Sequence, residues 1–175
     1  MKLVVPILLV LLISFSALAQ DPVGENAAAA SNSLAEVRNA QAALLLVFKS
    51  SVIDVTDRER AIIQDVLKAD PRPTGRYRWV HTQIARKLDK YSRKYKSLIA
   101  ARELSEADYV IYFNVVEFRR VLYSYYPYGE LFVIVKGSPE TLKPPRVIWR
   151  TKKMLFAEDA IGNLIKDLKI LRGES

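Results

Sequence analysis

The segment "YVIYFNVVEFRRVLY", residues 109–123, indicates the centre of a β-sheet. β-Branched and aromatic residues dominate it, which is the composition of a β-strand. Apolar side chains occupy both of its faces: Tyr109, Ile111, Phe113 and Val115 on one, and Val110, Tyr112, Val116 and Phe118 on the other, with Asn114 among them. A strand that is apolar on both faces is typical of the centre of a sheet that is covered on both sides.

Two more strands are expected after this stretch, at residues 131–136 and 146–155, joined by a turn-rich connection. The segment "YSYYPYGEL", residues 123–131, precedes the first of them. We place its turn at Tyr126–Gly129, because proline suits the second position of a turn and glycine supplies backbone freedom. The short connections predict that the three strands form an antiparallel meander.

A strand and two helices are expected upstream of residue 109. The continuous apolar run at residues 43–50 predicts a buried strand, while residues 34–42 fit either a linker or the start of a helix. "TDRE", residues 56–59, is a capping box, which predicts a helix that starts at Thr56 and runs to about Lys68. A longer helix follows from an apolar stripe at helical spacing: Tyr77, Val80, Ile84, Leu88, Tyr91, Tyr95 and Leu98.

The chain closes with a third helix, within "AEDAIGNLIKDLKILRGES", which Gly173 ends. The predicted fold class is therefore α+β. We expect a mixed sheet of about four strands, one βα unit plus an antiparallel three-stranded meander, with two or three helices packed on it. These elements form a single domain over residues 34–175.

The first 33 residues read as a targeting segment and a spacer. Residues 1–19 have a positive start, an apolar middle and the small residues "ALA" at 17–19, the pattern of a signal peptide cleaved after Ala19. The alternative is an uncleaved N-terminal anchor. Residues 20–33 are small and polar and predict a flexible linker. We therefore expect a periplasmic or secreted protein without a transmembrane segment after cleavage.

The composition excludes several kinds of chemistry. The chain has no cysteine and one histidine, so thiol catalysis, cysteine-ligated zinc and a histidine-based metal site are not expected. It has no G-x-S-x-G, H-E-x-x-H or glycine-rich phosphate loop. We expect no cofactor and no enzymatic activity, and we interpret His81, the one histidine, as a structural residue.

A resemblance supports the same compartment. "SEADYVIYFNV", "YGELFVIV" and "RVIWRTK" followed by "FAEDAIGNLIKDLKILRGE" resemble small secreted proteins and lipoproteins of bacterial envelopes. The "AD" before the long strand is similar to α/β domains of the TolB N-terminal type and of the curli-secretion lipoprotein. The resemblance implies an envelope location and a βαβ-containing fold, and it carries no catalytic residues. This chain lacks the lipobox cysteine of the lipoproteins.

The long helix is the first candidate site, because it concentrates the basic residues. The net charge is +8, and ten basic residues and one acid, Asp89, lie between Arg72 and Arg102. Eight of them would bind an anionic lipid or envelope polymer: Arg76, Arg78, Arg86, Lys87, Lys90, Arg93, Lys94 and Lys96. The alternative is a solvated helix face. Export argues against nucleic acid as the partner.

The tyrosine-rich loop is the second candidate. Its aromatic and charged side chains would bind a ligand or a partner protein: Arg119, Arg120, Tyr125, Tyr126, Tyr128 and Glu130. Glu117 and Glu130 would also approach each other across a hairpin, where a carboxylate pair could hydrolyse a substrate or form salt bridges. Our preferred hypothesis is a non-enzymatic binding or assembly module of the envelope. The alternatives are an anionic-surface binder that uses the basic helix and a hydrolase that uses Glu117 and Glu130.

Overall fold

The computed structural model describes residues 34–50, 57–137 and 143–174. Its elements follow the order η1 (Ala35–Val37), β1 (Ala42–Phe48), α2 (Arg58–Lys68), α3 (Tyr77–Tyr95), β2 (Ile99–Ala100), β3 (Tyr109–Val121), β4 (Ser124–Val135), β5 (Arg146–Arg150) and α4 (Ala157–Arg172). The signal peptide and linker predicted at residues 1–33 lie outside the described residues. None of the described helices is long and apolar enough to cross a membrane.

The strands form one mixed sheet in the order β2-β1-β3-β4-β5. β1 runs parallel to both β2 and β3, whereas β3, β4 and β5 are antiparallel neighbours. The α+β class, the parallel βα unit and the antiparallel meander are therefore confirmed. The sheet has five strands where about four are expected from the sequence. The additional strand, β2, has only two residues, too few to leave an alternating pattern in the sequence.

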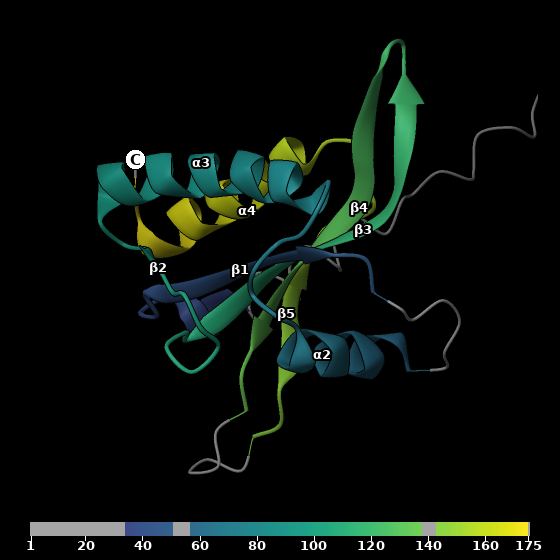
Figure 1. The fold of residues 1–175 in the computed structure, drawn as a ribbon. Helices are drawn as coiled ribbons and strands as arrows, with labels where there is room; N and C mark the ends of the chain where they lie inside the picture. The colour runs from purple at the N-terminus through teal and green to yellow at the C-terminus, as the bar shows by residue number, and fades with distance from the viewer. Residues whose placement is uncertain (1–33, 51–56, 138–142, 175) are drawn as a thin grey trace, which may run out of the picture.

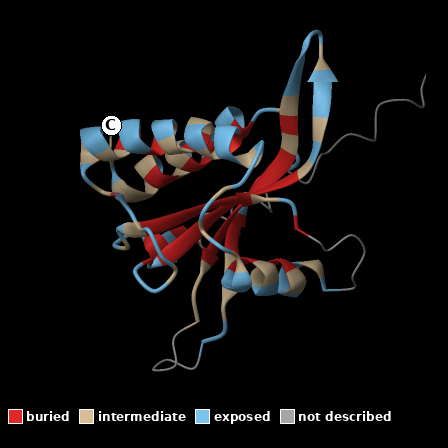
Figure 2. Ribbon diagram, in the orientation of Figure 1, coloured by how far each residue is buried: buried red, intermediate tan, exposed pale blue. Residues whose placement is uncertain are grey.

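The sheet is covered on both faces, as the sequence of β3 predicts. α3 and α4 lie side by side on one face and α2 lies on the other (Figure 1). Tyr109, Ile111 and Phe113 belong to the core under α3 and α4, while Val110 and Tyr112 belong to the core under α2. Figure 2 shows the buried residues gathered in the sheet and along the inner sides of the helices.

Near the end of β3 a β-bulge changes the face on which the side chains lie, so that they differ from the prediction. The register of β3 against β4 shifts between Val115 and Glu117. The extra residue moves the following side chains to the opposite face. Phe118 therefore packs on the α3–α4 side, where its ring centroid lies 6.0 Å from that of Tyr77. The strict alternation that groups Phe118 with Tyr112 is wrong for this reason.

Several element boundaries also differ from the prediction. Asp57, rather than Thr56, is the N-cap of α2, and its side chain accepts a hydrogen bond from the Arg60 amide. Thr56 itself lies outside the described residues. The segment before β1 holds a short 3-10 helix, η1, and not a long helix. β5 ends at Arg150 instead of residue 155, and only an isolated bridge at Met154 continues the pairing with β4.

Both α3 and α4 end at a capping residue with a left-handed backbone conformation. α3 ends at Tyr95, where Lys96 adopts a φ of 54° and donates its amide to the Ser92 carbonyl. Leu98 therefore lies beyond the helix, although its side chain is buried. α4 ends at Gly173, as predicted, and glycine adopts this left-handed cap without steric cost.

Candidate functional site

The β3–β4 hairpin extends beyond the rest of the sheet. The two strands pair from Tyr109 with Val135 to Val121 with Ser124. β1 accompanies β3 only as far as Asn114, and β5 accompanies β4 only from residues 132 to 135. Past these points the hairpin projects as a two-stranded ribbon (Figure 1). The ribbon holds its far end away from the helices, in a position where a partner could reach it.

The turn of this hairpin is not where the sequence predicts it. Leu122 and Tyr123 connect Val121 with its partner Ser124, whereas Tyr126–Gly129 is part of β4. Pro127 pairs with Phe118 within the strand. A proline is tolerated there because β5 does not pair with this part of β4, so no ladder on that side needs a proline N–H.

We call Leu122, Tyr123 and Tyr125 the hairpin tip. These residues are 83%, 93% and 61% exposed, and Figure 2 shows the end of the ribbon in the colour of exposed residues. Leu122 adopts a φ of 54°, in the left-handed region that L-residues other than glycine, asparagine and aspartate rarely occupy. The Nε atom of Arg120 donates a hydrogen bond to the Leu122 carbonyl, 3.1 Å away, and so supports this turn.

The six residues of the predicted loop site lie at different depths along the ribbon. Only Tyr125 belongs to the tip. Tyr126 packs edge-on against Phe156, with the ring centroids 5.1 Å apart. Arg119 lies over the ring of Tyr128, 3.5 Å from its centroid. Glu130 is buried at the base of the ribbon. The tip residues Leu122 and Tyr123 were not among the candidates, because the sequence places the turn elsewhere.

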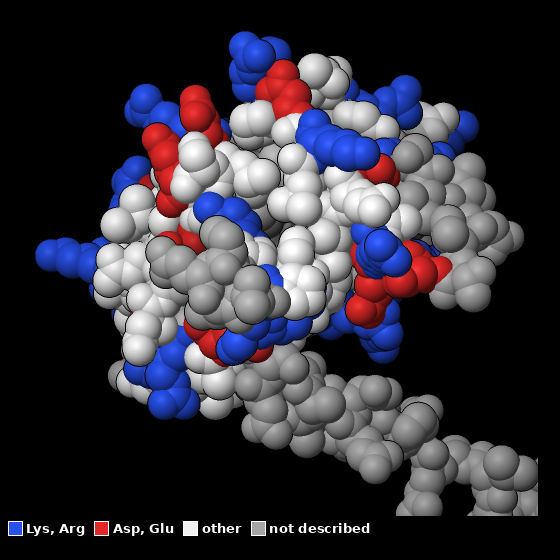
Figure 3. Space-filling view, turned by 90° about the horizontal axis from the view of Figure 1, so that it is seen from below, with Lys and Arg blue, Asp and Glu red and all other residues white. Residues whose placement is uncertain are grey.

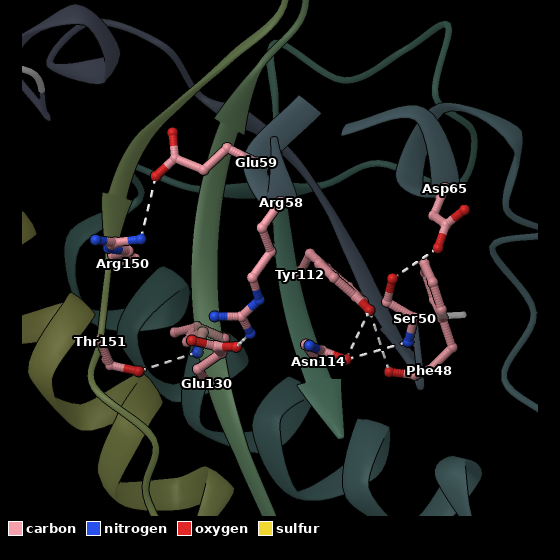
Figure 4. Close-up of polar contacts among 11 residues, drawn as sticks. Phe48, Ser50, Arg58, Glu59, Asp65, Tyr112, Asn114, Glu130, Arg150 and Thr151 are labelled. Carbon is pink, nitrogen blue, oxygen red and sulfur yellow. Dashed lines mark hydrogen bonds and ion pairs between the residues drawn. The ribbon is translucent and has the colours of Figure 1, made fainter. Parts of the chain in front are cut away.

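Glu117 and Glu130, the candidate carboxylates for hydrolysis, contact different arginines. Glu117 accepts a hydrogen bond from the Nε of Arg119, at 2.6 Å, and half of each of these side chains is exposed. Glu130 forms an ion pair with Arg58 of α2 (Figure 4). The register places Glu130 opposite Asn114 and Glu117 opposite Tyr128, on either side of the bulge.

A polar network near Glu130 connects α2 with the end of β1 (Figure 4). Ser50 donates its hydroxyl to Asp65, at 2.7 Å, and its amide to the Asn114 side-chain oxygen, at 3.1 Å. The Tyr112 hydroxyl donates to the same oxygen at 3.2 Å, and burial raises the pKa of this tyrosine. Because these groups are hydrogen-bonded to one another, the network acts as a polar anchor between helix and sheet.

The residues of the basic helix divide into two groups. Within the described residues, side-chain contacts are formed by Arg76, Lys87, Arg93 and Lys94, whereas none is found for the side chains of Arg78, Arg86, Lys90 and Lys96. Lys87, for example, donates to the Glu158 carbonyl at 2.9 Å. On the molecule's opposite side, seen from below in Figure 3, basic and acidic side chains are interspersed. Seven of the eight predicted basic residues are exposed, and Lys87 is partly buried.

His81 lies on the side of α3 that faces the edge of β1, and it is half-buried. Burial lowers its pKa, and a hydrogen bond to the Leu45 backbone opposes this shift. The residue is thus packed within the fold, as the sequence interpretation expects.

The comparisons with known proteins add no family to this description. Among the described residues, no three His, Asp or Glu side chains form a group that could hold a metal ion. Comparison of the chain with family models, with curated proteins and with solved structures gives no match.

Proposed function

We propose that this protein is a non-enzymatic binding module of the bacterial envelope that contacts a partner protein through the hairpin tip. The envelope location rests on the signal-like residues 1–19 and on the resemblance of the chain to envelope proteins. The partner-binding role rests on one observation: a leucine with a φ of 54° is 83% exposed at the end of the ribbon.

Two costs make Leu122 a poor choice for a turn that only connects strands. A left-handed backbone costs a residue with a Cβ roughly 1–2 kcal/mol, which Gly or Asn largely avoids. Its apolar side chain also remains in water. Two-residue hairpin turns favour Asn-Gly or Asp-Gly. Strained residues that present apolar surface are concentrated where a protein binds something, so the leucine supports a binding role.

The chemistry of the tip indicates what the partner surface offers. Leu122 and Tyr123 present an apolar and aromatic end, and Tyr125 stands beside them on the ribbon. Buried aromatic anchors supply much of the affinity at protein interfaces. Arg120, directly behind the turn, adds a positive charge. We infer a partner with an apolar pocket that is bordered by carboxylates or carbonyl groups.

Leu122→Gly separates binding from stability. Glycine removes the apolar side chain and also relieves the left-handed backbone, so this variant should be as stable as the wild type or more stable. We expect it to retain less than about a tenth of the wild-type partner in a pull-down from native envelopes, the loss expected for one interface hot spot. The control is Ile170→Ser, at another exposed apolar position. Serine is used there instead of glycine because Ile170 lies within α4, and glycine inside a helix would lower the stability. Retention of the same partner by Leu122→Gly and the wild type would exclude the tip.

A second candidate function is binding to an anionic surface through α3. Arg78, Arg86 and Lys90 recur at spacings of eight and four residues, which puts them on one outward side of the helix. Trp79 is 44% exposed on the same helix and could enter the interface of a membrane. Replacing the three basic residues by Glu should abolish sedimentation with phosphatidylglycerol vesicles at low salt. Equal sedimentation of this variant would rule out the helix as the binding surface.

A further inference from the structure

A cleft of about 590 Å³ lies at the edge of the sheet formed by β1 and β2. α3 borders it along one side, and the connection between α2 and α3 closes one end through Pro71 and Pro73. Apolar side chains form most of its lining: Ala43, Leu45, Ala85, Leu88, Leu98 and Ala101. Small-molecule sites in proteins have volumes of about 300–1,000 Å³ and are lined in this way.

The cleft exists because β2 is too short to cover the edge of β1. β2 pairs with β1 only at Ala42 and Ala43, although β1 continues to Phe48 beside β3. The His81 ring hydrogen-bonds to the backbone of Leu45, two residues past the last pair with β2. A peptide strand added at this edge would have to displace His81. The geometry therefore favours a small ligand over an added strand.

The charged groups at the rim of the cleft determine which polar group of a ligand would fit there. Asp89 is neutralised by Arg93, 2.9 Å away, and Arg72 is paired with Asp70 at 3.2 Å. Arg102 is exposed, and it is the backbone amide of this residue, not the guanidinium, that donates to Glu106. Among the charged residues that line the cleft, Arg102 is thus the one for which the described residues show no ion pair, and Glu106, beside its backbone, does not line the cleft. A guanidinium next to an apolar lining complements an anionic head group on a hydrocarbon chain.

We propose that this cleft binds a small single-chain amphiphile with an anionic head group, with the chain between α3 and β1 and the head group at Arg102. The interaction is independent of the hairpin, since none of the tip residues lines the cleft. An exported binding module with this cleft would respond to a lipid-derived acid while the hairpin contacts its protein partner.

The only histidine of the chain makes this proposal directly measurable, because His81 lines the cleft and its imidazole signals in an NMR spectrum need no assignment. The probe is decanoate, below its micellar concentration. Decanol and decyltrimethylammonium are the matched probes with a neutral and a positive head group. We expect saturable shifts of the His81 signals with decanoate, and binding about tenfold weaker or worse with the other two, as one charge-assisted hydrogen bond predicts.

Two variants locate the ligand within the cleft. Arg102→Glu should weaken decanoate binding by about tenfold or more, while Arg60→Glu, the same charge change at an exposed position on α2, should not alter it. Ala100→Trp, on β2, should occlude the cleft and abolish the shifts. If that variant does not fold, the comparison of Arg102→Glu with Arg60→Glu decides alone. The proposal is overturned if decanoate causes no saturable shift, if decanol binds as tightly, or if the two glutamate variants bind decanoate equally.

Discussion

Arg58 and Glu130 form an ion pair between α2 and β4 in which one partner is in contact with water and the other is not. The Arg58 side chain is 42% exposed and that of Glu130 only 6%. Removing the arginine would leave a carboxylate buried without its counter-charge, whereas removing the carboxylate would leave an arginine that can be hydrated. The pair is thus asymmetric in what each partner contributes to stability.

We therefore predict that Arg58→Met lowers the free energy of unfolding more than Glu130→Gln does. The loss for Arg58→Met should approach about 3 kcal/mol, and that for Glu130→Gln should be clearly smaller. Arg150→Met serves as a control, because Arg150 and its partner Glu59 are both more than half exposed and should contribute less than about 1 kcal/mol. Urea denaturation of the three variants gives the comparison. Equal losses for Arg58→Met and Glu130→Gln would contradict the asymmetry.

Gly129 is required by a close approach of two strands and not by a turn. A Cβ atom at this position would lie 2.1 Å from the carbonyl oxygen of Asn114, inside the backbone of β3. Gly129→Ala should therefore destabilise the protein by about 1–3 kcal/mol. Gly162→Ala is the matched control: its Cβ would meet only the end of Lys87 at 4.0 Å, and alanine favours the helix by about 1 kcal/mol. The two substitutions should shift the melting temperature in opposite directions, and a stabilised Gly129→Ala would refute the packing argument.

Two buried tyrosines should respond in opposite ways to the loss of their hydroxyl groups. Within the described residues the Tyr109 hydroxyl forms no hydrogen bond of good geometry, although the Arg172 guanidinium lies near it, and burial raises its pKa to about 12. Tyr91, in contrast, donates to Glu174 at 2.5 Å. Tyr109→Phe should leave the free energy of unfolding unchanged or raise it by about 1 kcal/mol, and Tyr91→Phe should lower it by about the same amount. A large loss of stability in Tyr109→Phe would mean that its hydroxyl is hydrogen-bonded.

The stability of the protein should fall between about pH 7 and pH 5 because of His81. Burial lowers the pKa of this histidine in the folded protein, while in the unfolded chain it stays near its usual value of 6.5. The unfolded state therefore binds more protons in this range, and the free energy of unfolding decreases as the pH falls. His81→Gln should lack this component, and the comparison is specific because the chain has one histidine. Equal pH slopes for both proteins would show that the imidazole is not buried in its neutral form.

The central architecture could be predicted because it depends on patterns that lie within single elements. The two apolar faces of β3 predicted a central strand, and the stripe from Tyr77 to Leu98 predicted the long helix α3, which ends at Tyr95. The parallel pairing of β1 followed from the helices between β1 and β3. For β3 and α3 the periodicity of one segment is sufficient, because burial selects for it directly.

The errors occurred where contacts between segments override local preferences. Proline and glycine at Pro127 and Gly129 are strong turn signals, but here Pro127 lies where β5 is absent and Gly129 lies against the carbonyl of Asn114. Leu122 carries no turn signal at all, although it forms the turn. The bulge that moves Phe118 to the other face depends on the pairing with β4 and leaves no mark on the sequence of β3. The predicted turn was therefore in the correct hairpin but placed too near its base.

Site-specific photo-cross-linking at Tyr123 tests the proposed function most directly. Tyr123 is 93% exposed at the tip, and Ile170 on α4 is 72% exposed on another part of the surface, so a benzoylphenylalanine at either position should leave the fold intact. If the tip binds a partner protein, irradiation of cells with the cross-linker at residue 123 gives a discrete product of higher mass. The cross-linker at residue 170 then gives none of that product. The absence of a discrete product from residue 123, or the same product from both positions, would contradict the assignment of the hairpin tip as the binding site.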